Sequence, residues 1–427
     1  MTYKGLALAA TFAVATTGAE AADLLPPAPI VDPVDYVRVC DAFGVGFFYI
    51  PGTETCLRIA GRVRADYNLF LDLENNGFEV LANFGFDQRA DDGYRFRSRA
   101  YIYLDSRTST EFGLLRTFTE LQFTSELGLG DGDTVFQNPG DGSALVSLNR
   151  AFIQFGGATF GRTQSFFDFL DASYGTSQFF NANFSDTTTN VAAYTATFGN
   201  GFSASVSVED AAERNTRILD LNGFIPNTSP NFIDGYGGLR APDVVGNLRV
   251  DAGWGSAQVM AAGHLVHSGL GTAASEYGFA VGGGINVNVP FGADTRFGIQ
   301  GAYTQGALAY VSETPVGPGV GDAVYTNAQN LELVEAFSVS GGFSFSATPK
   351  VTIGAQAGFV YVDHAEFQLN NQQRSLDFVN YDADVFIGYA PVEGFTLGVG
   401  SQYKYVDTEQ DGDGSALSTF FRAQRTF

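Results

Sequence analysis

The sequence predicts an all-β fold: a 16-stranded antiparallel transmembrane β-barrel with a constriction loop folded into its pore. Three observations support this. Apolar and polar residues alternate through many segments of about ten residues, as in strands with lipid on one side and water on the other. No segment has the ~18 consecutive apolar residues of a membrane-spanning helix. The connections between alternating segments are long and short in turn, as in barrels whose loops differ at the two membrane faces.

The first residues have the features of a secretory signal peptide spanning residues 1–21. Lys4 precedes an apolar stretch, and Ala19-Glu20-Ala21 is a small-residue cleavage site of the A-x-A type. The alternative is an N-terminal hydrophobic helix. The mature chain is therefore expected outside the cytoplasm.

Residues 22–55 are expected to form an N-terminal periplasmic segment, followed by the barrel over residues 56–427. Cys40 and Cys56 lie close together in the chain, and in an oxidising compartment two such cysteines are expected to pair. Closing a loop of this size contributes roughly 3 kcal/mol to stability. A metal site would need more ligands than two cysteines and three distant histidines offer, so no cofactor is expected.

Charge and composition restrict the classes of binding partner and of secondary structure. The formal net charge of −23 argues against nucleic acid, because phosphate binding requires a basic surface. The 52 glycines, 40 phenylalanines and 19 tyrosines favour strands and turns. Arginines gather in the alternating segments of the first third, whereas acids concentrate in gaps such as "GLGDGDTVFQNPGDGS". The basic residues therefore belong to strands and the acids to loops.

The alternating segments predict the strands in order. In "LRIAGRVRADYNLF", residues 57–70, apolar side chains occupy one face and arginines the other. Applied along the chain, this pattern predicts strands at 56–70, 93–107, 113–126, 145–156, 158–163, 190–199, 201–209, 244–253, 254–266, 277–289, 295–309, 332–346, 349–362, 378–390, 394–405 and 416–427.

The connections predict the orientation of the barrel. The gaps 71–92 and 164–189 are long, whereas 108–112 and the single residue Gly157 are short. Bacterial outer-membrane barrels have short periplasmic turns and longer external loops, which places both termini in the periplasm. The last strand ends the chain at Phe427, and a terminal aromatic on a closing strand resembles an outer-membrane assembly signal. The alternative is that this terminal aromatic is there by chance.

The segment "YRFRSRAYIY" predicts which face of a strand meets water. Arg95, Arg97 and Arg99 lie on one face, and Phe96 and Ile102 lie on the other. An arginine facing lipid near mid-membrane costs roughly 2–4 kcal/mol. The arginines are therefore expected to face the lumen, which in a sixteen-stranded barrel is an aqueous channel.

The fifth predicted strand, 158–163, is short and precedes the Phe-rich segment "QSFFDFLDASYGTSQFFNANFSD". A strand that ends at mid-height would start this loop inside the barrel. Opposed charges across the narrowed passage create a transverse field that screens ions. The alternative is that each arginine pairs with a neighbouring carboxylate and stiffens the wall. The residues expected at the constriction are Arg62, Arg64, Arg97, Arg99, Arg150, Arg162, Asp168 and Asp171.

Residues 34–67, "VDYVRVCDAFGVGFFYIPGTETCLRIAGRVRADY", resemble the N-terminal signature of the alphaproteobacterial general-diffusion porin family. "NRAFIQFGGATFGRTQSFFDF" and "YTATFGNGFSASVSVED" resemble further family blocks, and the resemblance covers nearly the whole mature chain. It implies a homotrimeric porin of the bacterial outer membrane, with Cys40 and Cys56 as the family disulfide and "GRTQSFFDF" opening the constriction loop. Ala423 departs from the family, in which an aromatic is expected.

The expected function is passive diffusion of small hydrophilic solutes and ions, with lipid and lipopolysaccharide as further partners. An enzyme is not expected, because a hydrolase needs a His beside its nucleophile and His264 and His267 point to opposite faces of a strand. The acidic Asp-Gly segments are predicted to be tight turns that could bridge Ca²⁺ loosely. The alternatives are a surface adhesin or a substrate-specific channel, for example for sugars, with Tyr101, Tyr103 and Phe118 as inward aromatics.

Overall fold

The computed structural model divides the chain into two units, Met1–Arg38 and Val39–Phe427, and the fold described below is that of the second. The expected signal peptide, residues 1–21, lies outside the described residues. Within the part that is described, no helix is long and apolar enough to cross a membrane. The described residues are 38–75, 93–127, 144–170, 184–220, 235–269, 275–290, 293–312, 320–327, 330–364, 367–369, 372–408 and 412–427.

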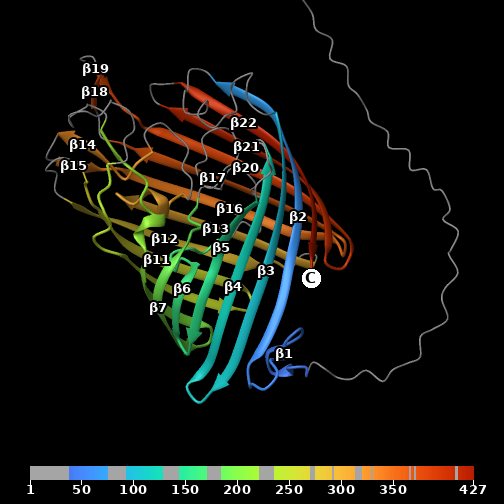
Figure 1. Cartoon of the computed structure of the whole chain (residues 1–427). Coiled ribbons are helices and arrows are strands. Elements are labelled where there is room, and N and C mark those ends of the chain that lie inside the picture. Colours follow the sequence, from blue (N-terminus) through green and yellow to red (C-terminus); the bar gives the residue numbers. More distant parts are fainter. Residues whose placement is uncertain are drawn as a thin grey trace, which may run out of the picture. The chain divides into compact units, whose positions relative to one another are not determined.

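A closed antiparallel β-barrel forms the second unit (Figure 1). In the described ranges the sheet has 17 strands, which are the two-residue β1 and sixteen barrel strands. Each barrel strand is hydrogen-bonded to the next, and the last pairs with the first to close the ring. The barrel strands are β2 (Cys56–Asn75), β3 (Tyr94–Thr110), β4 (Gly113–Leu127), β5 (Ala144–Phe155), β6 (Ala158–Gln164), β7 (Thr188–Gly199), β8 (Phe202–Glu209), β10 (Asp243–Ala252), β11 (Gly255–Val266), β12 (Glu276–Asn288), β13 (Ala293–Gln305), β16 (Glu335–Thr348), β17 (Val351–Asp363), β20 (Phe378–Val392), β21 (Phe395–Thr408) and β22 (Asp413–Thr426).

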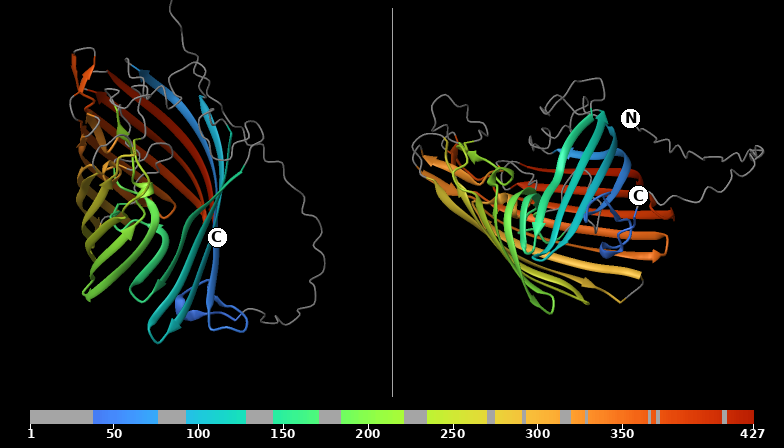
Figure 2. Two further views of the ribbon diagram at one scale, coloured as in Figure 1. Left: turned by 60° about the vertical axis from the view of Figure 1, so that its left-hand side comes forward. Right: turned by 60° about the horizontal axis from the view of Figure 1, so that its bottom comes forward.

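The predicted barrel is confirmed, with strands in the predicted order and differences at their ends. Figure 2 shows neighbouring strands side by side and inclined around the wall. The first strand continues past its predicted end at residue 70 to Asn75. The strand predicted at 295–309 ends at Gln305, because Gly306 has a φ of +67° and the chain then turns into a buried 3₁₀ helix. Glycine adopts that left-handed conformation at little steric cost, so the chain can turn away from the wall at this residue.

Tight turns join the strands at one end of the barrel. Asn200 and Gly201, between β7 and β8, have φ values of +50° and +82°. Two consecutive positive φ angles are typical of the type I′ turn that matches the twist of a β-hairpin. Phe427 exchanges two backbone hydrogen bonds with Gly61 at 2.9 and 3.0 Å, so the last residue extends the pairing of β22 with β2.

The two faces of the barrel wall differ in chemistry. In β3, Phe96 and Ile102 point outward and are 51% and 40% exposed, whereas Arg97 and Tyr101 point inward and are buried. Because a lipid-facing arginine near mid-membrane is costly, this arrangement suits hydrocarbon outside and water inside.

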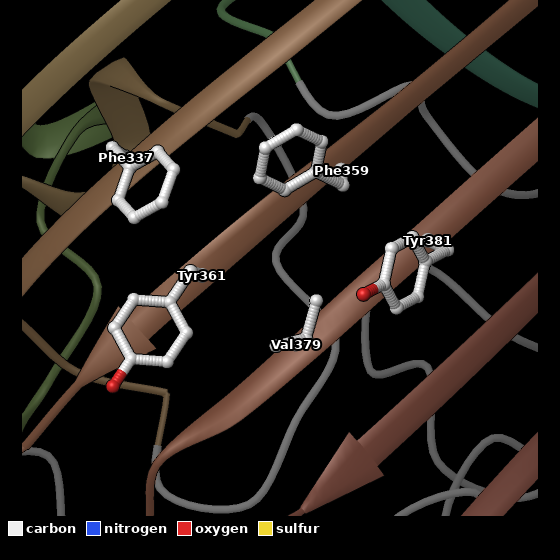
Figure 3. Close-up of a pocket in the computed structure, with 5 residues that line it drawn as sticks. All are labelled: Phe337, Phe359, Tyr361, Val379 and Tyr381. Carbon is white, nitrogen blue, oxygen red and sulfur yellow. The ribbon is translucent and has the colours of Figure 1, made fainter.

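Aromatic rings gather on the outer face where β16, β17 and β20 lie side by side. They line a shallow hollow of about 390 Å³ (Figure 3). Phe337 follows the start of β16 and Tyr361 precedes the end of β17, so the hollow lies at the strand ends away from the tight turn 349–350. Aromatic rings at this height are typical of the girdle at a membrane–water interface. The lining residues are Phe337, Phe359, Tyr361, Val379 and Tyr381.

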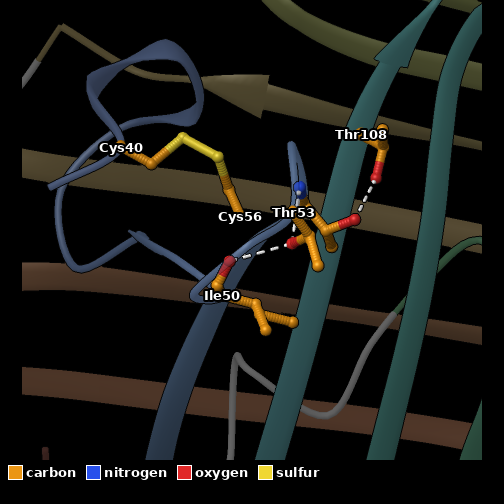
Figure 4. The surroundings of a disulfide bond; sticks show 6 residues. Cys40, Ile50, Thr53, Cys56 and Thr108 are labelled. Atoms are coloured by element: carbon orange, nitrogen blue, oxygen red, sulfur yellow. Dashed lines mark hydrogen bonds between the residues drawn. A yellow bond between two sulfur atoms is a disulfide. The ribbon is translucent and has the colours of Figure 1, made fainter. Parts of the chain in front are cut away.

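A small disulfide-bonded module precedes the barrel. It contains the 3₁₀ helix η1 (Asp41–Phe43) and β1 (Phe48–Tyr49), which pairs with the start of β2. The predicted disulfide between Cys40 and Cys56 is confirmed, and both cysteines are buried (Figure 4). Phe47, next to the disulfide, packs beneath the guanidinium groups of two arginines on β2 and β3. These contacts attach the module to the barrel wall.

Some of the shorter elements in the connections, namely β9, η3 and β14, pack against the inner wall. β9 pairs with β14 in parallel and β14 with β15, which gives a three-stranded sheet, and β18 and β19 form a separate hairpin. Buried apolar residues of these connections join inward residues of the barrel in one cluster, so part of the interior is apolar. The elements are η2 (Ala211–Glu213), β9 (Ile218–Leu219), η3 (Leu308–Tyr310), β14 (Ala323–Asn327), β15 (Asn330–Leu333), β18 (Phe367–Leu369) and β19 (Gln372–Arg374).

Candidate pore constriction

Four of the predicted arginines lie together on the inner wall. Arg62 and Arg64 come from β2, and Arg97 and Arg99 come from β3. In the antiparallel register of these strands, Arg64 lies directly opposite Arg99. Like charges directly opposite each other destabilise a strand pair, so this pair requires water or an anion beside it. The alternation of β2 and β3 places all four guanidinium groups on the lumen side.

Asp66 is the carboxylate at the centre of this group. Its Oδ2 accepts a hydrogen bond from Arg97 Nη2 at 3.0 Å and lies 3.2 Å from Arg64 Nε. Its Oδ1 accepts a 2.7 Å hydrogen bond from Nε of Arg422, on β22. One buried carboxylate therefore holds three arginines from three strands, across the seam where the barrel closes.

The remaining two arginines contact neutral groups. The guanidinium of Arg62 lies over the ring of Tyr101, 4.0 Å from its centroid. Arg99 donates hydrogen bonds to Thr124 Oγ1 at 3.0 Å and to the Tyr101 hydroxyl at 3.4 Å. Within the residues that the structure describes, neither arginine has a carboxylate within ion-pair distance, so this part of the wall presents positive charge to the lumen.

Arg150 and Arg162 are placed apart from this group. Arg150 donates to Gln164 Oε1 at 3.0 Å, and its Nε lies 3.9 Å from a carboxylate oxygen of Glu120. Arg162 forms a 2.9 Å ion pair with Glu213, in η2. Both arginines thus have carboxylate partners, as the alternative reading of the sequence expects for individual residues.

The segment that follows β6 enters the barrel. Residues Ser165–Leu170 run along the inner faces of β10, β11 and β13, where polar side chains bind their backbone. Asp171 lies outside the described residues. The contacts are Asn247 Nδ2 to the Phe166 carbonyl at 2.6 Å, Gln258 Nε2 to the Phe167 carbonyl at 3.3 Å and the Leu170 N–H to Gln300 Oε1 at 3.1 Å.

Asp168 anchors this inserted segment. It accepts hydrogen bonds from Arg214 at 3.1 Å, from the Thr187 N–H at 2.7 Å and from Gln164 at 2.7 Å. It also accepts one from the hydroxyl of Ser185. Burial alone would lower the pKa of Arg214, but the carboxylate of Asp168 raises it above its usual value. With its side chain 2% exposed, Asp168 holds the two ends of the loop together rather than presenting its charge to the channel.

A polar network fixes the connections above the inserted segment. The Tyr310 hydroxyl donates to Asp243 at 2.7 Å, and His264 Nδ1 lies 2.8 Å from the other oxygen of the same carboxylate. The Tyr236 hydroxyl lies 3.1 Å from His264 Nε2 and donates to Asp322 at 2.7 Å. The network ties two connections, 210–242 and 306–334, to β10 and β11, so His264 has a structural role.

Arg422 and Arg214 are functional residues that the sequence reasoning missed. Arg422 follows the outward Phe421 on the last strand, so alternation places its side chain on the inner face. Pairing the last strand with the first then brings it opposite Asp66. Arg214 lies in a connection, where no periodic pattern marks it, and it becomes recognisable only when the fold brings it to Asp168.

Comparison with known proteins identifies the family. Residues 27–425 match the model of the Porin subfamily. The chain belongs to this porin family. The porin is 32% identical over 366 residues to Porin Omp2b of Brucella neotomae and 33% identical over 362 residues to Porin Omp2b of Brucella canis. In both comparisons the match covers 84% of each chain.

The barrel also resembles a solved channel. The crystal structure of the outer membrane channel DcaP of Acinetobacter baumannii superposes with a TM-score of 0.66. It is 16% identical in sequence, and the match covers 89% of this porin and 99% of that chain. At this identity the likeness shows the fold alone. Family membership and fold together make the protein a porin of the bacterial outer membrane.

Proposed function

We propose that the porin passes small hydrophilic solutes and ions by passive diffusion, and that its narrowest passage lies between the arginine wall and the inserted segment. The observation that carries the proposal is where the arginine wall and the inserted segment lie around the circumference of the barrel. Seven strands separate β2 from β11 on one side (β3 to β8 and β10), and seven on the other (β12, β13, β16, β17, β20, β21 and β22). The segment Ser165–Leu170 therefore lies across the lumen from the arginines.

The residues of this passage fall into two groups. Arg62, Arg64, Arg97 and Arg99 supply a positive wall, which Arg422 extends across the seam. Arg150, on β5, and Arg162, on β6, lie at the base of the inserted segment, and Asp168 lies within it. Asp171 follows this segment in the sequence and lies outside the described residues. Because charges that line a pore set its selectivity, the wall favours anions at mid-barrel.

Single-channel recording in planar bilayers tests this function. The purified porin should give ohmic conductance steps in KCl, and polyethylene glycols below a size limit should reduce the step height because they enter the lumen. Absence of steps would overturn the proposal. Conductance that saturates with one neutral sugar would instead favour the substrate-specific alternative.

The assembly and environment follow from family membership. We propose a homotrimer surrounded by lipid and lipopolysaccharide, which cross-linking of the porin in outer-membrane vesicles tests by the size of the largest product. We propose that the channel needs no cofactor and has no catalytic activity; His264 is bound within the polar network and His267 contacts Ser275. Loose bridging by Ca²⁺ is confined to acidic loops that lie largely outside the described residues.

A further inference from the structure

A continuous row of aromatic rings lies on the inner wall below the arginines. Tyr101 and Tyr103 follow one another on the inner face of β3, Phe118 lies on β4 and Phe152 on β5. Successive ring centroids are 6.1, 6.3 and 5.4 Å apart, with interplanar angles of 17°, 19° and 30°. We call these four residues the aromatic row.

The row runs from mid-barrel towards the tight turns. Tyr101 lies opposite Arg62 in the register of β2 and β3. Phe118 lies opposite Phe152, close to the tight turn at 156–157 that ends β5. Tyr103, Phe118 and Phe152 are partly exposed on a face that meets lumen water. These three rings therefore form a surface that a solute can reach, whereas Tyr101 is buried beneath Arg62. None of the four belongs to the apolar cluster elsewhere in the barrel.

Positive charge flanks the row at both ends. Arg62 covers the ring of Tyr101, and Arg116 lies 5.3 Å from the centroid of Phe118 and 5.4 Å from that of Phe152. Arg116 is held by a carboxylate, because it forms an ion pair at 3.0 Å with Asp105, which also pairs with Arg107 at 2.8 Å. Among the described residues Arg62 has no carboxylate within ion-pair distance. The upper end of the row therefore offers an arginine to an anionic group.

We propose that the aromatic row, with Arg62 at its upper end, is a binding track for solutes that carry a ring and a carboxylate. Ring pairs prefer centroid separations of about 4.5–7 Å, which is the spacing within the row, so a solute ring can exchange one aromatic partner for the next along the wall. Arg62 receives the carboxylate at mid-barrel, and the rings below hold the apolar face of the solute. The track rests on the proposed function, because it needs an open lumen.

The chemistry excludes two simpler solutes. A small carboxylate without a ring meets the arginine but gains nothing from the aromatic row. A neutral sugar meets the rings but leaves the arginine without a counter-charge. A solute therefore binds in the track only if one molecule carries both a ring and a carboxylate. Uronic acids and aromatic acids both meet this requirement.

Blocking of single-channel current tests the track. Glucuronate, benzoate, acetate and glucose are added at equal concentration to the porin in KCl. Glucuronate and benzoate should interrupt the current in a saturable way, with block constants roughly tenfold lower than those of acetate and glucose. Block by benzoate alone would restrict the track to aromatic acids, and block by glucuronate alone to uronic acids. Equal block by acetate and benzoate would overturn the proposal.

Substitutions in the aromatic row test whether the solute that blocks the current binds there. Phe118→Leu removes a ring of the row and keeps an apolar side chain; Phe160→Leu is the matched control, because Phe160 is 52% exposed on the outer face. The first should weaken block roughly tenfold and the second should leave it unchanged. Equal block in the two variants would contradict the track. If Phe118→Leu forms no pore, Tyr103→Leu makes the same comparison. The KCl conductance of each variant reports the open lumen, so failure of the pore and failure of the track are distinguished.

Discussion

The carboxylate of Asp66, on the first barrel strand, accepts a 2.7 Å hydrogen bond from Arg422, on the last, although the two residues are 356 positions apart in the chain. The same carboxylate binds Arg97, on the second strand, at 3.0 Å. Three consecutive strands of the closed ring, β22, β2 and β3, are thus joined on the inner face by one ion cluster. This ion cluster has two roles. It stabilises the seam where the barrel closes, and it fixes the orientation of the guanidinium groups that line the lumen.

The first prediction concerns the stability of this seam. Asp66→Asn should lower the free energy of unfolding by about 3 kcal/mol, because it leaves buried guanidinium groups without their carboxylate. Asp251→Asn is the control: its pair with Arg249 lies at the surface, where Asp251 is 56% exposed, and the expected change is about 0–1 kcal/mol. Urea unfolding in detergent, followed by tryptophan fluorescence and circular dichroism, measures both. Equal midpoints and slopes for the two variants would contradict the assigned role of Asp66.

The second prediction concerns the two faces of the wall. Ile102→Arg places a charge on the outer face of β3 and should destabilise the folded porin by roughly 2–4 kcal/mol in a bilayer. Gln122 lies opposite Tyr101 on the inner face, so Gln122→Arg meets lumen water and should cost less than about 1 kcal/mol. Unfolding equilibria in lipid vesicles give the comparison. A larger loss for Gln122→Arg would reverse the assignment of the faces.

The third prediction concerns the inserted segment. A Cβ at Gly284, on β12, would lie 2.5 Å from the ring of Phe169, which is closer than carbon atoms approach. Gly284→Ala should therefore displace this ring, loosen Ser165–Leu170 and give a higher, noisier single-channel conductance. Gly263→Ala, on β11, is the matched control, because its Cβ would meet no atom within 4 Å. Indistinguishable current traces from the two variants would show that Phe169 does not hold the segment against the wall.

The sequence predicted the barrel well because its signal is repeated and local. Alternation in segments such as 93–107 reports which face meets lipid, and sorted loop lengths report the two membrane sides. Phe96 and Ile102 are outward and Arg97 inward, as this periodicity requires. The family resemblance added the disulfide, which two cysteines in an exported chain already favoured.

The site was predicted only in part, because it depends on contacts between distant segments. Parity placed Arg64 and Arg99 on the inner face, but their position opposite each other follows from strand register. Asp168 was expected to face the arginines across water, whereas the structure places it in a buried pair with Arg214. Composition does not distinguish a loop carboxylate that lines a channel from one that anchors a loop.

The reversal potential across a KCl gradient tests the central claim most directly, namely that the arginine wall faces the lumen at its narrowest part. The double substitution Arg64→Gln with Arg99→Gln should shift the reversal potential towards that of a cation-selective pore, because two lumen charges are lost. Arg425→Gln is the control; Arg425 is exposed, and it donates to the backbone carbonyl of Glu393 in the turn between β20 and β21. It should leave the potential unchanged. A reversal potential that is the same in the porin and in the double variant would contradict the account.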